Sequence, residues 1–327
     1  MAAIIITVVL MTVITLITVG FSLTVRREQR NTLDHQLATQ AFYAAESGIS
    51  LAQKRISTMG TAPKKDGCAY NSNTNNYGLA VTDYDIGNGA SITCLLVEPN
   101  VPTLEYQNVG TGSIPTLVRS GSSAVTSIKI SWNESGSADL TGCAGASVPS
   151  PAFGPAGPAS GCAQPILRVD LVPLGATGAS LSRATLQTGQ ITTFLYPGAG
   201  AGSASPTGLQ NILIANCGAG NTPKLCNMSI TGLNSQSYGV RVMSLYGTSD
   251  ITITAFNGAT QLSLIDQQVI VDVTAKAQDV LKRVQARTSI TGKAPDFALV
   301  GDICKRYAIS AGQVLDPTAT YPACAIP

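Results

Sequence analysis

The sequence has little charge, few aromatic side chains and a single histidine. Only 12% of its 327 residues are Asp, Glu, Lys or Arg, 5% are Phe, Trp or Tyr, and the formal net charge is +2. A whole-chain charge this small does not indicate a strongly acidic or basic partner. The lone histidine, His35, belongs to no Ser-His-Asp set and no metal-ligand cluster in the sequence. We therefore expect no enzyme activity, no bound metal and no cofactor.

The first 25 residues contain no charged side chain. Residues 2–25 read AAIIITVVLMTVITLITVGFSLTV. As an α-helix this stretch would be about 36 Å long, and a bilayer core is about 30 Å thick. A secretory signal would have basic residues in front, a shorter apolar core and small residues at a cleavage site. None of these is present, so we expect residues 1–25 to form a helix that spans a membrane or packs on other helices.

Residues 26–58 are expected to continue this helix as an amphipathic segment. Apolar residues recur there at helical spacing and predict a narrow stripe that docks on a sheet or on other helices. The expected docking residues are Leu33, Leu37, Ala41, Ala45 and Ile49. Gly60 and Pro63 then end the helix.

Residues 59–327 have the composition of a β-rich, loop-rich extracellular head. Strands are predicted at 91–97, 127–132, 165–174, 184–196, 237–246, 250–256, 267–277 and 279–289. We expect the last two to form a hairpin, and the sequence GTSD at 247–250 to form a hairpin turn. The predicted fold class is α+β: a long N-terminal helix packed on an antiparallel sheet or small sandwich with disulfide-bonded loops.

All eight cysteines follow the apolar helix, and none forms a C-x-x-C pair of the kind found in zinc and redox sites. An even number fits an exported protein in which every cysteine is in a disulfide. We expect sequence neighbours to pair, because each pair closes a short, turn-rich loop; free buried thiols are the alternative. The expected pairs are Cys68–Cys94, Cys143–Cys162, Cys217–Cys226 and Cys304–Cys324.

The N-terminal helix resembles that of a known family. The stretch QLATQAFYAAESGISLAQKRI at 36–56 is similar to the helix of type IV pilins and type II secretion pseudopilins, especially the larger minor pilins. The resemblance covers about the first 57 residues, and the head is similar only in class. It implies a structural subunit of an extracellular type IV pilus-like filament with a methylated N-terminus, serving adhesion or twitching motility. The apolar helix would hold the subunit in the inner membrane before assembly.

The resemblance also implies roles along the helix. The filament core would be formed by Ile4, Ile5, Ile6, Val9, Leu10, Val13, Leu16 and Ile17. Any unwinding in a filament is expected near Gly20, Phe21 and Ser22, because glycine is a poor helix former; a continuous helix is the alternative. The implied partners are copies of this chain or other pilins, the inner membrane, and a host or partner-cell surface.

Two features depart from the family pattern. Ile5 stands where the family has an acidic residue. Candidates for interhelical hydrogen bonds in its place are Thr7, Thr12, Thr15 and Thr18. These hydroxyls can instead bond to their own helix. No leader precedes residue 1, and we expect the numbering to begin at the mature N-terminus.

Basic residues gather in two places. Arg26, Arg27 and Arg30 follow the apolar segment, and the positive-inside rule alone would place them in the cytoplasm; the cysteines favour the opposite orientation. The second cluster consists of Lys276, Lys282, Arg283, Arg287, Lys293, Lys305 and Arg306. It allows a DNA-binding surface, but a solvated strand face or a subunit contact is the favoured interpretation.

Two other functions remain open. A tip-located minor pilin that acts as adhesin or assembly primer is favoured by Ile5 and by the large head. A membrane-anchored binding protein that never polymerises would leave the pilin-like stretch AFYAAESG unexplained.

Overall fold

The chain divides into two compact units. The computed structural model describes residues 2–68, 77, 84–110, 112–121, 123–136, 140, 143, 162, 164–175, 189–206, 209–218 and 225–290. The first unit comprises Met1–Glu98 and Val269–Thr288, and the second comprises Pro99–Gln268 and Ser289–Pro327. The expected head at 59–327 is therefore divided, since its first and last described strands belong to the same unit as the helix.

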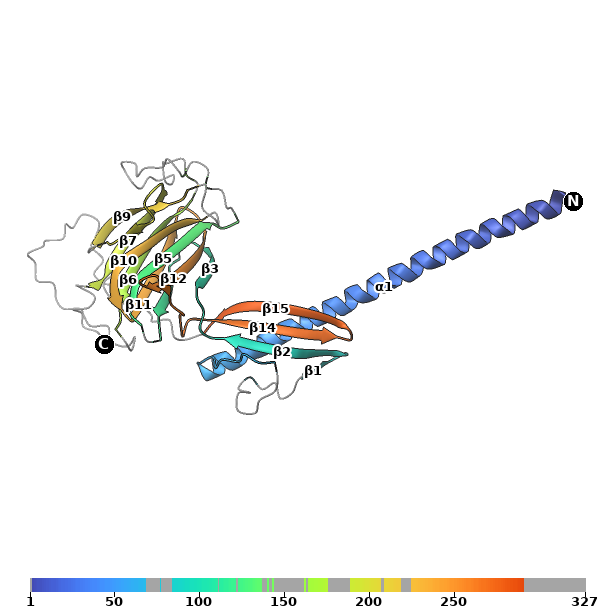
Figure 1. Ribbon diagram of the computed structural model, residues 1–327, viewed down its shortest axis with the longest axis horizontal. Helices are drawn as coiled ribbons and strands as arrows, with labels where there is room; N and C mark the ends of the chain where they lie inside the picture. The colour runs from blue at the N-terminus through green and yellow to red at the C-terminus, as the bar shows by residue number, and fades with distance from the viewer. Residues whose placement is uncertain are drawn as a thin grey trace, which may run out of the picture. The chain divides into compact units, whose positions relative to one another are not determined.

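The first unit combines one helix with a small antiparallel sheet (Figure 1). Helix α1 spans Ala2–Met59 without interruption. The strands are β1 (Tyr84–Gly87), β2 (Ala90–Glu98), β14 (Gln268–Ala277) and β15 (Val280–Ser289), in the order β1-β2-β14-β15. The predicted hairpin at 267–289 is confirmed, with a two-residue turn at Gln278 and Asp279.

Helix α1 packs on one face of this sheet at a glycine. A Cβ added to Gly48 would lie 2.8 Å from Val273 Cγ1 and 2.9 Å from Ile92 Cδ1. Because alternate residues of a strand share a face, the residues of β14 that face the helix with Val273 are Val269, Val271, Ala275 and Ala277. All of these are fully buried. A helix of small side chains on a sheet of mostly β-branched ones therefore forms the core of this unit.

The second unit is a mixed sheet of eleven strands. Its strands are β3 (Leu104–Val109), β4 (Ile114–Arg119), β5 (Val125–Glu134), β6 (Ile166–Pro173), β7 (Ile191–Gly198), β8 (Ser203–Ala204), β9 (Leu209–Asn216), β10 (Cys226–Ser235), β11 (Ser237–Leu245), β12 (Ser249–Asn257) and β13 (Thr260–Gln261). The order is β13-β12-β5-β10-β9-β7-β6-β11-β4, with β3 paired to β12 and β8 to β10. The β7–β9 and β8–β10 pairs are parallel, and the other pairs are antiparallel.

Strand β3 brings the two ends of this sheet together. It pairs with β12 near one end, and Gly110, which directly follows it, accepts a 3.2 Å hydrogen bond from the N–H of Ser244 in β11 near the other end. The side chain of Gln268 bonds to both backbone groups of Glu105 in β3, at 3.0 and 2.7 Å. The sheet thus curls toward a barrel.

Two predictions about strand pairing were wrong. The GTSD sequence joins β11 to β12, which are not neighbours in the sheet, so it is not a hairpin turn. The described strands also form two sheets, one of them mixed, whereas one antiparallel sheet or a small sandwich was expected. Alternation of apolar and polar residues identifies a strand, but it is the same for parallel and antiparallel strands and does not identify the partner.

The core of the second unit is built from alternating residues of neighbouring strands. Ile128, Ile130 and Trp132 of β5 are fully buried, as is Ile253 of β12. The indole Nε1 of Trp132 donates a 2.8 Å hydrogen bond to the carbonyl oxygen of Pro165. Because Trp132 is the only tryptophan in the chain, its fluorescence reports on this unit specifically.

Tyr196 in β7 has a fully buried hydroxyl with no hydrogen-bond partner in the described part of the chain. Replacing a buried, unpaired hydroxyl by hydrogen removes a desolvation cost, so Tyr196→Phe should leave the free energy of unfolding unchanged or raise it by up to about 1 kcal/mol. Urea unfolding followed by Trp132 fluorescence measures this. Tyr238→Phe is the matched control, because the Tyr238 hydroxyl accepts a 2.8 Å hydrogen bond from the N–H of Asn234. If Tyr196→Phe lowered the free energy of unfolding as much as Tyr238→Phe does, the prediction would be contradicted.

Candidate functional site

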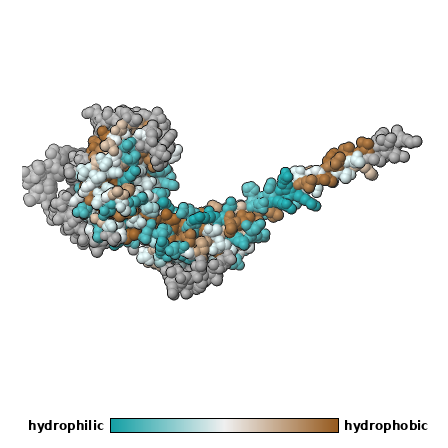
Figure 2. Space-filling view, in the orientation of Figure 1, coloured by the Kyte–Doolittle hydropathy of each residue, from teal (hydrophilic) through white to brown (hydrophobic). Residues whose placement is uncertain are grey.

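The apolar half of α1 is exposed along its length. From Val9 to Leu23 every large apolar side chain is 49–73% exposed, and Figure 2 shows this part of the helix as largely hydrophobic. The predicted core residues among them are Val9, Leu10, Val13, Leu16 and Ile17. Ile4, Ile5 and Ile6 belong to α1, but their side chains lie outside the described part of the structure. By length and composition α1 is able to cross a membrane, a property that it shares with N-terminal signal sequences.

The hydroxyls of this segment bond to their own helix. Thr12, Thr15 and Thr18 each donate to a backbone carbonyl three or four residues earlier, at 2.7–2.8 Å. They are therefore satisfied without a second helix. The helix also continues through Gly20, Phe21 and Ser22, so the predicted weak point is not unwound in the single chain. A backbone with every internal hydrogen bond formed suits an apolar environment.

The docking surface of α1 begins later than predicted. Ala41, Ala45 and Ile49 are buried, but Leu37 is only half-buried and Leu33 is 56% exposed. The buried set also includes Ala44, Gly48, Ala52 and Ile56. Ala44 and Gly48 were missed because they carry little apolar surface; the signal for them was a run of small residues at helical spacing, which allows close approach to a sheet.

The same helical face continues toward the N-terminus without a sheet to cover it. Positions 26, 30, 33 and 37 follow one another at spacings of three or four residues and lead directly into Ala41, so they share the docking face. Arg26, Arg30 and Leu33 are exposed on it. We call these residues with Leu37 the uncovered stripe. It combines two cations with two leucines, and the exposed Asp34, seven residues before Ala41, lies on the same helical face.

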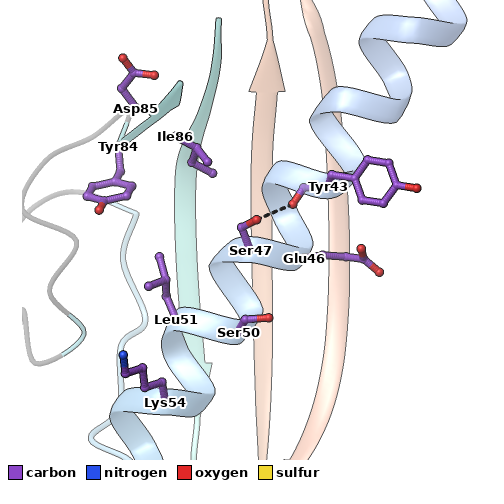
Figure 3. Close-up of a pocket in the computed structure, with 9 residues that line it drawn as sticks. All are labelled: Tyr43, Glu46, Ser47, Ser50, Leu51, Lys54, Tyr84, Asp85 and Ile86. Atoms are coloured by element: carbon purple, nitrogen blue, oxygen red, sulfur yellow. Dashed lines mark hydrogen bonds between the residues drawn. The ribbon is translucent and has the colours of Figure 1, made fainter. Parts of the chain in front are cut away.

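A second surface is a groove between α1 and strand β1 (Figure 3). It has a volume of about 600 Å³. Its apolar walls include Tyr43, Leu51 and Ile86, which are 61%, 36% and 38% exposed. Figure 3 shows Leu51 and Lys54 extending from α1 toward the side on which Asp85 lies, whereas Tyr43 and Glu46 extend from the other side of the helix. The carboxylates of Glu46 and Asp85 therefore lie on opposite sides of α1. We call this surface the α1–β1 groove.

Two kinds of contact fasten the chain that follows α1 to β2, and a third joins two points of that connection. Lys65 and Val97 exchange backbone hydrogen bonds of 2.9 and 2.8 Å, and Cys68 forms a disulfide with Cys94. The hydroxyl of buried Tyr77 donates a 2.6 Å hydrogen bond to the carbonyl of Pro63, and burial raises the pKa of Tyr77 to about 12. The first two contacts hold the chain directly after the helix against the sheet.

The basic cluster of the C-terminal region is only partly within the described structure. Arg283 Nε in β15 donates to both carboxylate oxygens of Asp272 in β14, at 2.8 and 2.9 Å, and this pairing raises the pKa of the guanidinium. The other exposed basic residues of the hairpin are Lys276, Lys282 and Arg287. Lys293, Lys305 and Arg306 lie outside the described residues. Cations along β15, an edge strand among the described strands, oppose the addition of another strand.

Three disulfides are present among the described residues: Cys68–Cys94, Cys143–Cys162 and Cys217–Cys226. They are three of the four neighbour pairs predicted from the sequence, and the fourth, Cys304–Cys324, lies outside the described residues. Disulfides together with an apolar N-terminal helix favour membrane anchoring and an extracellular location.

The described residues offer no cluster of metal ligands. His35 is exposed on α1, and within the described ranges no group of three or more His, Cys, Asp or Glu residues could hold a metal ion. The candidate functional surfaces are therefore the exposed apolar helix, the uncovered stripe and the α1–β1 groove. Comparison of the chain with known protein families, characterised proteins and solved structures finds no match.

Proposed function

We propose that this chain is a structural subunit of an extracellular filament of the type IV pilus kind. Its apolar helix would be held in the inner membrane before assembly and packed against the helices of other subunits afterwards, with the β-rich units outside. The observation that carries the proposal is a single uninterrupted helix whose first half is apolar and exposed and whose second half is docked on a sheet.

The free energy of burying the apolar half of α1 supports this proposal. Burial of one large apolar side chain is worth about 1.5–3 kcal/mol. Ten large apolar side chains line α1 from Val9 to Leu23. Leaving all of them in water would forgo this free energy of burial ten times. In the proposed cycle they pass from lipid to a protein interior and never meet water, so assembly and disassembly need only a modest net free energy.

A charge in the apolar half should prevent assembly. Leu16 is 73% exposed, and an aspartate at the centre of an apolar helix costs about 2.5–3.5 kcal/mol. We expect Leu16→Asp to remove the chain from filaments sheared off the native cell surface, while Trp132 fluorescence stays that of the folded second unit. Leu16→Met keeps the apolar volume and should assemble normally. Mass spectrometry of the sheared filaments, with the membrane fraction as reference, measures both. Normal filaments from Leu16→Asp, or absence of the wild-type chain from filaments, would overturn the proposal.

A tip subunit that binds another surface is the second candidate. It is favoured by the second unit, a large curled sheet that is compact in itself and separate from the unit that contains the helix. Such a unit suits recognition of a host or partner-cell surface. The number of copies per filament distinguishes the two roles, because a tip subunit occurs a few times per filament and a body subunit along its whole length.

A further inference from the structure

We infer that Arg26, Arg27 and Arg30 bind the phosphate groups of anionic phospholipids at the surface where α1 leaves the bilayer. We call these three residues the arginine collar. The inference rests on the proposed function, in which the chain spans a membrane before assembly. It goes further in naming the class of lipid that the chain prefers and the residues that select it.

The arginine collar begins directly where the apolar half of α1 ends. No charged residue precedes Arg26, and the large apolar side chains from Val9 to Leu23 are exposed. At 1.5 Å per residue, Arg26 lies about 1.5 Å and Arg30 about 7.5 Å beyond Val25 along the helix. The headgroup layer extends about 5–8 Å beyond the hydrocarbon core on each side. A helix with Val25 at the edge of the core therefore places all three arginines in the headgroup layer.

The direction of the helix aims these side chains at the membrane. In an α-helix every Cα–Cβ bond tilts toward the N-terminus, which in α1 is the apolar end. The arginine side chains thus lean back toward the bilayer, and their apolar stems can follow the helix while the charged groups stay at the surface. A guanidinium can donate two parallel hydrogen bonds to one phosphate, so the geometry of the collar suits this ligand.

The arginine collar is free to take a ligand. All three side chains are exposed, and none of them forms an ion pair within the described part of the chain. At 100° per residue they lie within a sector of about 100°, so one side of α1 presents three guanidinium groups. The sheet of the first unit covers the helix only from Ala41, about 24 Å beyond Val25, and does not reach the collar.

Two carboxylates lie near the arginine collar. Glu28 falls within the headgroup layer, but it points about 160° away from both Arg26 and Arg30 around the helix. Asp34 lies on the same side as the collar, but about 13.5 Å beyond Val25, which is outside the headgroup layer. Within that layer three guanidinium groups thus stand against one carboxylate. The remaining positive charge favours anionic over zwitterionic lipids around the helix.

Photo-cross-linking of lipids to the full chain tests this preference. The chain is reconstituted in phosphatidylcholine vesicles with a trace of photoactivatable phosphatidylglycerol or, in a parallel sample, of photoactivatable phosphatidylcholine. At low salt we expect about five times more adduct with phosphatidylglycerol, which corresponds to about 1 kcal/mol. The ratio of the two adducts should approach one in 1 M salt, where charges are screened beyond about 3 Å.

Variants of α1 locate the preference. The triple variant Arg26→Gln, Arg27→Gln and Arg30→Gln should bring the adduct ratio to about one, because glutamine removes the charge and remains a good helix former. Glu28→Gln removes the carboxylate from the headgroup layer and should raise the ratio about twofold. Arg55→Gln is the matched control. Arg55 is exposed on the same helix about 45 Å beyond Val25, so its loss should leave the ratio unchanged.

The outcomes separate this inference from the proposed function. Equal adducts of the two lipids with the wild-type chain, or a wild-type ratio in the triple variant, would overturn the arginine collar, while filaments from the native cell would keep the proposed function standing. A wild-type chain that alkaline carbonate extracts from the vesicles does not span the bilayer, and this result would overturn both.

Discussion

Replacing Gly48 with valine should detach the second half of α1 from its sheet. The added Cβ would approach Val273 Cγ1 and Ile92 Cδ1 to less than 3 Å, and both belong to buried side chains of a close-packed interface. Overpacking of this kind costs about 1–3 kcal/mol, and the two further methyl groups of valine add to it. We expect the amide protection of residues 41–56 against hydrogen exchange to fall by about a hundredfold, or about 3 kcal/mol.

Two comparisons make this measurement specific. Gln53→Val introduces the same side chain at an exposed position of the same helix and should cost only about 0.5 kcal/mol of helix propensity. Trp132 fluorescence should be unchanged in both variants, because Trp132 belongs to the other unit. Full protection of the helix in Gly48→Val would mean that the helix–sheet interface is looser than the structure indicates.

Replacing Gly200 with alanine should destabilise the second unit severely. A Cβ at this position would lie 1.7 Å from the carbonyl oxygen and 2.5 Å from the carbonyl carbon of Ile214. These are backbone atoms, and they cannot turn aside as a flexible side chain can. Ile214 is held in register with Tyr196 by the parallel β7–β9 pairing, and the N–H of Gly200 donates a 2.9 Å hydrogen bond to Ala215. To relieve the overlap, the paired ends of β7 and β9 must move apart.

We expect Gly200→Ala to lower the free energy of unfolding by about 3 kcal/mol or more, at the upper end of the range for single substitutions. Urea unfolding followed by Trp132 fluorescence measures this directly. Gly121→Ala is the matched control, because a Cβ there meets no atom within 4 Å and needs no unusual backbone conformation. An unfolding midpoint shared by the two variants would contradict the prediction.

The strands were easier to predict than their partners. Residues 250–256 were expected to pair with 237–246 through a tight turn, yet β12 pairs with β5, more than a hundred residues earlier in the chain. Apolar alternation is a local property, whereas strand pairing depends on contacts between residues that are far apart in the sequence. The sequence therefore predicted eight of the described strands, but it missed β3, β4, β9 and β10 among others, and it did not predict that two sheets would form.

The candidate surfaces could likewise be predicted only in part, because they depend on contacts between distant segments. Leu33 belongs to the same helical stripe as Ala41, and the sequence alone predicted that both would dock. Only the three-dimensional extent of the sheet shows that the covered part begins near Ala41 and leaves Leu33 exposed. The α1–β1 groove was not predicted at all, because its two sides, at 43–54 and 84–86, are brought together only by the fold.

The sequence by itself determined the features that depend on neighbouring residues. An uncharged run followed by an amphipathic stripe specifies one long helix, β-branched alternation specifies strands, and closely spaced cysteines favour local disulfides. The tertiary structure decided the division into two units, the curled mixed sheet and the set of helix residues left exposed. The physical reason is that helix and strand periodicity arise from the local backbone, whereas burial depends on which distant segments meet.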